Sequence, residues 1–109
     1  MKVIRINNRD YRLKFTTRAI TDLNAKGITL ISLASDIETL NLSSLYEAFC
    51  EGLRFANKNI TLDDVYELMD MYYEEGGDAE AFSIIVLEEY AKSMGLGKKF
   101  KEIIEQQQN

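Results

Sequence analysis

The residue types that usually carry enzyme chemistry are almost missing from this chain. Its 109 residues include no histidine and one cysteine, Cys50. Tetrahedral zinc sites are built mainly from cysteine and histidine, and a nucleophilic serine or cysteine needs a neighbouring base, most often an imidazole. We therefore expect neither a metal centre nor nucleophilic catalysis, and we interpret Cys50 as a small residue of the core.

Carboxylates are abundant, and three pairs of them are adjacent in the sequence: Asp63 with Asp64, Glu74 with Glu75, and Glu88 with Glu89. Adjacent residues of a helix point about 100° apart, so such a pair does not share one site. The segment 70–78 also lacks the alternating oxygen ligands around a glycine that a calcium-binding loop requires. These carboxylates indicate a solvated acidic surface, and we expect no enzyme and no cofactor.

The stretch Gly95-Leu-Gly-Lys-Lys99 is superficially similar to a phosphate-binding loop. It lacks the first glycine at the required distance and the serine or threonine after the lysine, and it follows a helical pattern instead of a strand. We interpret this stretch as the end of a helix.

Charge is distributed unevenly along the chain, whose formal net charge is −5. Residues 1–18 contain six basic side chains and one acidic side chain, whereas residues 61–80 contain eight acidic side chains and no basic one. Such an acidic surface repels phosphate groups. Binding to another protein is therefore the preferred hypothesis, and the alternative is a small regulatory or nucleic-acid-associated protein that acts through its basic N-terminal segment.

That alternative rests on the basic N-terminal segment. Its candidate contact residues are Arg5, Arg9, Arg12 and Lys14, accompanied by the aromatic Tyr11. Cations interleaved with an aromatic ring are typical of proteins that bind single-stranded nucleic acid. The same cations also suit the outer side of an exposed strand, where lysine and arginine discourage aggregation.

The basic segment has the alternating pattern of two short β-strands. Ile4 and Ile6 occupy every second position within residues 2–6, and apolar residues alternate with basic ones within residues 11–15. The intervening Asn7-Asn-Arg-Asp10 tolerates the positive φ of a tight turn. We predict a β-hairpin over residues 1–15.

From residue 16 onwards, apolar residues recur with helical spacing. Helices are predicted over residues 16–27, 30–39, 44–57, 61–76 and 78–95, with a further amphipathic turn or two over residues 98–105. Predicted N-caps are Thr16 or Thr17, Thr29, Thr61 and Asp78, and Ser44 with Glu47 forms a predicted capping box. The expected fold is α+β and mainly helical, with an N-terminal hairpin followed by a bundle of about five helices.

The chain length suits a single domain, which we assign to residues 1–105, with residues 106–109 as a frayed tail. The longest apolar stretch, residues 81–87, is far shorter than the roughly 20 residues that cross a membrane. The first residues lack the apolar core of a signal peptide. A lone cysteine agrees with a reducing compartment, so we expect a cytoplasmic protein without membrane contact.

Residues 4–23, IRINNRDYRLKFTTRAITDL, and residues 26–33, KGITLISL, show a recognisable combination of motifs. They resemble the opening of the small tail assembly chaperones of long-tailed bacteriophages and of related gene-transfer-agent tail proteins. The shared pattern is I-N-G-x-x-Y-x-L-x-F-T followed by G-x-S-L-x-x-L. Here Asn8 replaces the turn glycine and Thr29 replaces the serine. Beyond the first third of the chain, the E-E-G-G-D break at residues 74–78 is also similar.

The resemblance implies a protein that works in the cytoplasm of the bacterial host. Its expected partner is the tape-measure protein, which it would keep soluble while tail-tube subunits assemble around that partner. The tail tube protein is a second expected partner. The basic hairpin and the acidic fourth predicted helix also suggest head-to-tail self-association between copies.

A tape-measure helix presents apolar stripes, and such stripes bind in grooves between helices. Tyrosine and methionine adapt to varied partners, so we select candidate partner-binding residues on the fourth and fifth predicted helices. They are Tyr66, Met69, Tyr72, Tyr73, Phe82, Ile85, Val86 and Tyr90. The alternative is that the same residues form the core.

Overall fold

The chain begins with the β-hairpin that the sequence predicts. The computed structural model describes residues 1–108, leaving out the side chains of residues 103, 104, 107 and 108. Strand β1 (Lys2–Ile6) pairs antiparallel with β2 (Arg9–Leu13), and Ile6 lies opposite Arg9. Asn7 and Asn8 have φ values of 52° and 62°. Positive φ at both turn residues matches the twist of the strands, so β2 begins two residues earlier than predicted.

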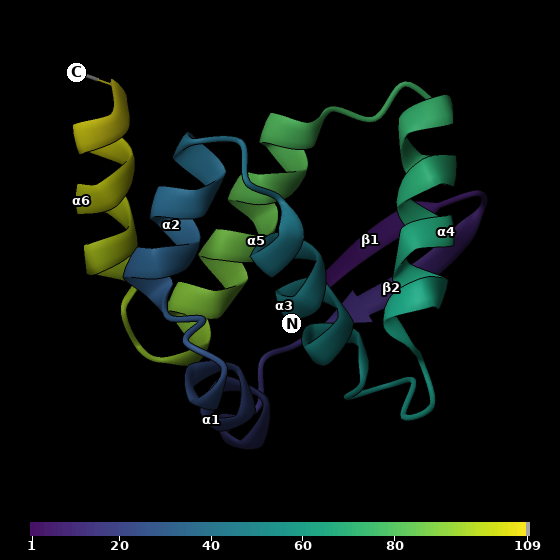
Figure 1. The fold of residues 1–109 in the computed structure, drawn as a ribbon, viewed down its shortest axis with the longest axis horizontal. Helices are drawn as coiled ribbons and strands as arrows, with labels where there is room; N and C mark the ends of the chain where they lie inside the picture. The colour runs from purple at the N-terminus through teal and green to yellow at the C-terminus, as the bar shows by residue number, and fades with distance from the viewer. Residues whose placement is uncertain (109) are drawn as a thin grey trace.

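Six helices follow within the described residues (Figure 1). They are α1 (Thr17–Ala25), α2 (Leu30–Glu38), α3 (Ser43–Leu53), α4 (Leu62–Glu74), α5 (Ala79–Ser93) and α6 (Gly97–Gln108). The α+β, mainly helical fold class is thereby confirmed. Residues 106–108 of the predicted tail lie within α6, and Asn109 lies outside the described residues.

Side-chain caps begin four of these helices as predicted. The hydroxyl oxygens of Thr16, Thr29 and Thr61 and the carboxylate of Asp78 each accept a backbone N–H three residues further on, at 2.9–3.2 Å. The backbone N–H groups of Thr29 and Thr61 in turn donate to the side-chain oxygens of Ser32 and Asp64, which completes a capping box at each helix start. These short local bonds explain why the starts of the helices are readable from the sequence.

Helix α3 departs from its prediction at both ends. Its N-cap is Leu42, which makes no side-chain capping bond, so the predicted capping box of Ser44 with Glu47 is wrong. Ser44 Oγ instead donates to Asp36 Oδ2 at 2.7 Å, because α2 ends beside the start of α3. The helix ends at Leu53 and not near Asn57.

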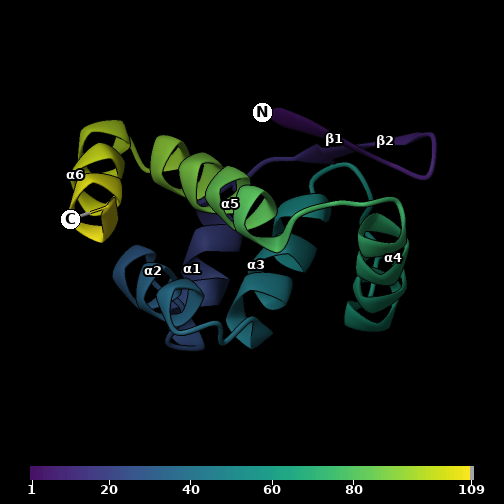
Figure 2. The same ribbon diagram turned by 90° about the horizontal axis from the view of Figure 1, so that it is seen from above.

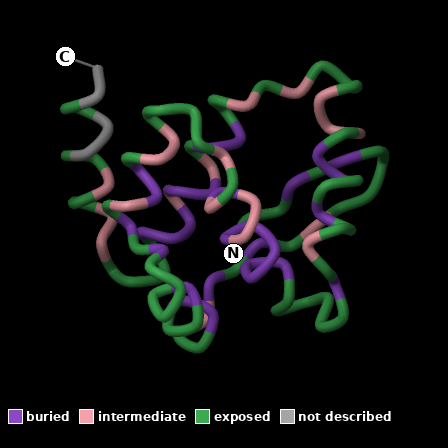
Figure 3. Tube along the Cα trace, viewed as in Figure 1, coloured by how far each residue is buried: buried purple, intermediate pink, exposed green. Residues whose placement is uncertain are grey.

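Helix α5 lies in the middle of the molecule and packs against α2, α3 and α6, and buried residues gather around it (Figure 3). Tyr90 is fully buried, and its hydroxyl oxygen lies within hydrogen-bond distance of two acceptors, Asn24 Oδ1 at 3.0 Å and the Ile28 carbonyl oxygen at 3.2 Å. The Phe15 ring lies 5.2 Å from the Tyr90 ring, so the end of the hairpin also reaches α5. The core therefore joins the first third of the chain to the last.

The hairpin lies along one side of the helices and extends from α5 to α4 (Figure 2). The backbone N–H of Asn7, in the turn, donates to the carboxylate of Glu75 at the end of α4. At the other end, Lys14 N–H donates to the Gly52 carbonyl of α3 at 3.0 Å. Gly52 permits this approach, since a Cβ there would lie 2.3 Å from Leu13 Cδ1.

Candidate functional site

Candidate metal ligands and the single thiol were the first groups considered in the sequence, and the structure shows where they lie. No group of three or more carboxylates or thiols among them is placed to hold a metal ion. Cys50 is buried, and burial raises the pKa of its thiol, which keeps the sulfur protonated. None of the described helices combines the length and the apolar character needed to cross a bilayer.

The structure places half of the candidate partner-binding residues in the core. Met69, Phe82, Val86 and Tyr90 are almost completely buried, so the prediction that they contact a partner is corrected. For Phe82, Val86 and Tyr90 the physical reason is the central position of α5, which is covered on more than one side by other elements, whereas Met69 lies on the buried side of α4, which packs against α3. An apolar helix of this kind fills the core and presents little surface.

The four remaining candidates are at least partly accessible. Tyr66 is 46% exposed, and Tyr72, Tyr73 and Ile85 are half-buried. Tyr72 packs beneath the surface, with its ring 5.6 Å from the Phe82 ring and its hydroxyl 3.4 Å from the Asp78 carbonyl. Tyr72 thus stabilises the connection between α4 and α5, and Tyr66 and Tyr73 are left as surface tyrosines of α4.

A third tyrosine, Tyr46 of α3, joins these two. Its ring lies 6.2 Å from the Tyr66 ring in an edge-on arrangement, and its hydroxyl oxygen lies 2.8 Å from that of Tyr73. We call Tyr46, Tyr66 and Tyr73 the tyrosine surface. Tyr66 and Tyr73 are seven residues apart and therefore share one face of α4. The tyrosine surface is a continuous aromatic strip that crosses from α3 to α4.

Sequence reasoning missed Tyr46. The helical spacing of its neighbours Leu45 and Phe49 indicates a core stripe, and Tyr46 lies about 100° away from that stripe. Its contact with α4 depends on how the two helices pack, and no local motif encodes that packing. The only available signal was its type, a tyrosine on the flank of an amphipathic helix.

An acidic strip borders the tyrosine surface on α4. Asp63 and Asp70 lie three residues before and four residues after Tyr66, so both are its neighbours on the helix surface. With Glu67 and Glu74 they form a row of exposed carboxylates, and none of these four makes an ion pair within the described part of the chain. Burial, together with the hydrogen bond between the Tyr73 and Tyr46 hydroxyls, raises the pKa of Tyr73, so its hydroxyl stays neutral. An aromatic strip beside uncompensated negative charge fits a partner that has an apolar face and basic residues next to it.

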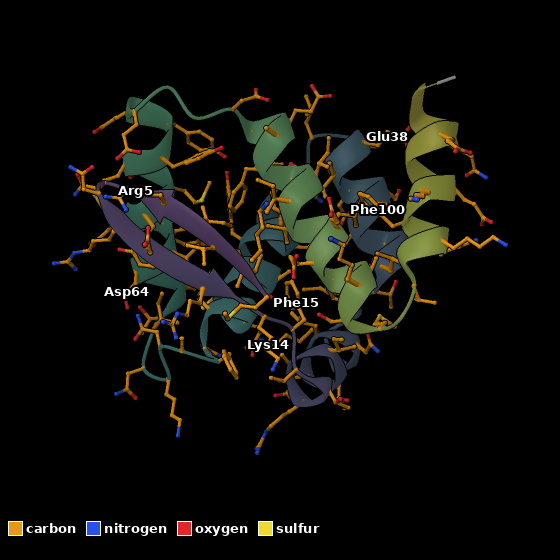
Figure 4. The ribbon with its side chains drawn as sticks, turned by 180° about the vertical axis from the view of Figure 1, so that it is seen from behind. Arg5, Lys14, Phe15, Glu38, Asp64 and Phe100 are labelled. Carbon is orange, nitrogen blue, oxygen red and sulfur yellow. The ribbon has the colours of Figure 1, made fainter. Side chains whose placement is uncertain are left out.

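The candidate hairpin cations divide into two groups. Arg5 pairs with Asp10 at 2.9 Å, and Lys14 Nζ lies 4.5 Å from the centroid of the Phe55 ring. Arg9 and Arg12 are exposed, and neither makes an ion pair with another described residue. Arg5 lies on the hairpin at the side of the molecule formed by α4 (Figure 4).

Comparison with known proteins gives no match. No family model fits the chain, and no curated protein or solved structure is significantly similar to it.

Proposed function

We propose that this protein is a tail assembly chaperone of a long-tailed bacteriophage, which binds the tape-measure protein during assembly of the tail tube. The motifs at residues 4–33 support the family. The tyrosine surface beside the acidic strip of α4 is the observation that carries the proposed binding mode. In this mode the apolar stripe of a helix of the tape-measure protein, the client, binds to the tyrosine surface.

Two physical arguments support this mode of binding. Tyrosine rings offer a large contact area at a low cost in side-chain entropy, since only two side-chain torsions are restrained. The row of carboxylates attracts lysine or arginine next to the client's apolar stripe and accelerates the encounter. Because the rings are already partly buried, the additional area covered by a client is modest. The complex is then expected to dissociate readily, as a transfer to tail-tube subunits requires.

Co-expression with the tape-measure protein encoded beside it tests this proposal. The wild-type chain should increase the soluble fraction of that client, and Tyr66→Ser should remove most of the increase. Ile31→Ser is the matched control, because Ile31 is an apolar residue of α2 that is 57% exposed and distant from the tyrosine surface in sequence. Equal client solubility with the wild-type chain, Tyr66→Ser and an empty vector would refute the proposal.

Arg9 and Arg12, which form no ion pair with another described residue, favour one competing function, nucleic-acid binding by the hairpin. Retention of the protein on single-stranded DNA, measured across a salt series, tests it. Salt-sensitive retention that is lost in Arg9→Glu with Arg12→Glu, together with no effect on client solubility, would replace the chaperone proposal by this function.

A further inference from the structure

An apolar cleft opens where α2 ends and α5 begins. Its volume is about 280 Å³, and Ile37, Leu40, Leu42 and Ile84 form its apolar walls. Two carboxylate residues, Glu38 and Glu80, also line it. Leu40 is 80% exposed, the largest exposed fraction among the large apolar residues that the structure describes.

The backbone of Leu40 is as unusual as its exposure. Four helices end in the same capped turn, in which one residue has positive φ and donates its N–H to the carbonyl three residues earlier. The next residue then donates its N–H to the carbonyl five residues before it. In α1, α4 and α5 the positive-φ residue is a glycine: Gly27, Gly76 and Gly95. In α2 the same position is occupied by Leu40, with φ 61°.

Folding alone does not favour leucine at this position. A residue with a Cβ is strained in the left-handed region, which is why glycine predominates there. The capping hydrogen bonds come from the backbone of Leu40 and Asn41, so the leucine side chain adds nothing to them. A strained, exposed leucine in an apolar cleft indicates a contact made outside the folded chain.

The charges around the cleft restrict what can bind there. Two clefts facing each other across a twofold axis would bring Glu38 and Glu80 against the same carboxylates of the second copy, and like charges repel. The occupant must instead combine an apolar side chain with cations. The outer face of the hairpin presents this combination, because Val3 is 49% exposed and lies directly opposite Arg12 in the strand register.

The cleft and the hairpin face cannot meet within one molecule. Arg5 of the hairpin and Glu38 of the cleft lie on opposite sides of the structure (Figure 4). We infer that the outer face of the hairpin of one copy binds in the cleft between α2 and α5 of the next copy, with Val3 against Leu40 and Arg12 beside Glu38 and Glu80. A contact between two different surfaces joins copies head to tail. This inference does not depend on the proposed function.

The purified full-length protein provides the first test, by sedimentation and light scattering over a range of concentrations and salt. Because the cleft is small, association is expected only above about 100 µM and at low ionic strength. Leu40→Gly should weaken association by about tenfold or more, since the apolar contact is lost. The thermal unfolding temperature of the same variant should not fall, because glycine suits the left-handed backbone. Ile31→Ser, outside the cleft, should associate like the wild type.

Charge reversal provides a second test that does not rely on Leu40. Glu38→Lys with Glu80→Lys should be monomeric alone, and so should Arg5→Glu with Arg12→Glu, because Arg5 and Arg12 share the outer face of the hairpin with Val3. An equimolar mixture of the two variants should associate again, because each reversed surface then meets a complementary one. Glu67→Lys with Asp70→Lys makes the same charge change on α4 and serves as the control, which should associate like the wild type.

Several outcomes would overturn the inference. A wild-type chain that remains monomeric at roughly 1 mM and low salt would do so, since even small specific interfaces associate under those conditions. A mixture of the reversed variants that remains monomeric would exclude the paired surfaces. If the α4 control loses association and the cleft variant does not, the contact between copies involves α4 and not the cleft. If the cleft variant associates normally but no longer solubilises the client, the cleft binds the client and not a second copy.

Discussion

Gly52→Ala should destabilise this protein, although the same exchange stabilises most helices. A glycine inside a helix usually costs about 0.5–1 kcal/mol relative to alanine. At position 52, however, the new Cβ would lie 2.3 Å from Leu13 Cδ1 and 3.1 Å from two ring atoms of Phe15. Leu13 is fully buried and Phe15 is 2% exposed, so neither side chain has free space to enter.

The expected size of the effect follows from these opposing contributions. Inserting a methyl group into a well-packed core typically costs about 1–3 kcal/mol. The gain in helix propensity offsets part of that cost, which leaves a net loss of roughly 1–2 kcal/mol. For a domain of this size, such a loss lowers the unfolding temperature by about 5–15 °C.

Thermal and urea unfolding followed by circular dichroism measure this loss. Gly97→Ala is the control, because Gly97 is the first residue of α6 and nothing lies within 4 Å of the position of its added Cβ. In the double variant Gly52→Ala with Leu13→Ala, the shortened side chain makes room for the methyl group. The double variant should therefore lose at least about 1 kcal/mol less unfolding free energy than the sum of the losses of the two single variants. A Gly52→Ala variant as stable as the wild type would refute the close approach of the hairpin to α3.

Three further changes test other parts of the structure. Thr61→Ala removes the oxygen that accepts the Asp64 N–H and should cost about 0.5–2 kcal/mol in urea unfolding, and an unchanged midpoint would contradict the cap. The raised pKa of Tyr73 favours the folded state at any pH below the ordinary tyrosine pKa of about 10, and stability should fall as the pH increases beyond that value. Tyr73→Phe should make this alkaline decline shallower, and an equally steep decline would exclude Tyr73 as its source. Leu40→Gly should increase the free energy of unfolding by roughly 1 kcal/mol, because the relief of backbone strain exceeds the added freedom of the unfolded chain, and a lower stability would show that Leu40 is needed for folding.

The parts of the fold that the sequence predicts are those that short-range bonds determine. The asparagine turn fixes the hairpin, and Thr29 and Thr61 hold their helix ends through bonds to residues three positions away. The capping box of Ser44 failed because Asp36, eight residues away and on another helix, binds that hydroxyl. A helix cap can be predicted from its neighbouring residues unless a residue from another part of the fold binds the same side chain.

The candidate site was less predictable, because it depends on which side of each helix is covered. The sequence shows that α5 is apolar around much of its circumference, and this pattern suits either a central helix or a contact surface equally well. In the structure, packing against neighbouring elements buries Phe82, Val86 and Tyr90 in the core. The same packing brings Tyr46 beside Tyr66 and Tyr73, a juxtaposition that no spacing along the chain encodes.

The central position of α5 has a consequence for how the protein is made. The N-terminal part of the chain is synthesised first. The hydroxyl of Tyr90 contacts Asn24 and the Ile28 carbonyl, which are synthesised more than sixty residues earlier. Until α5 is translated, α2 and α3 lack the central helix that packs against both of them, and Phe15 lacks its contact with the Tyr90 ring. The core can therefore be completed only after α5 has been translated, late in synthesis.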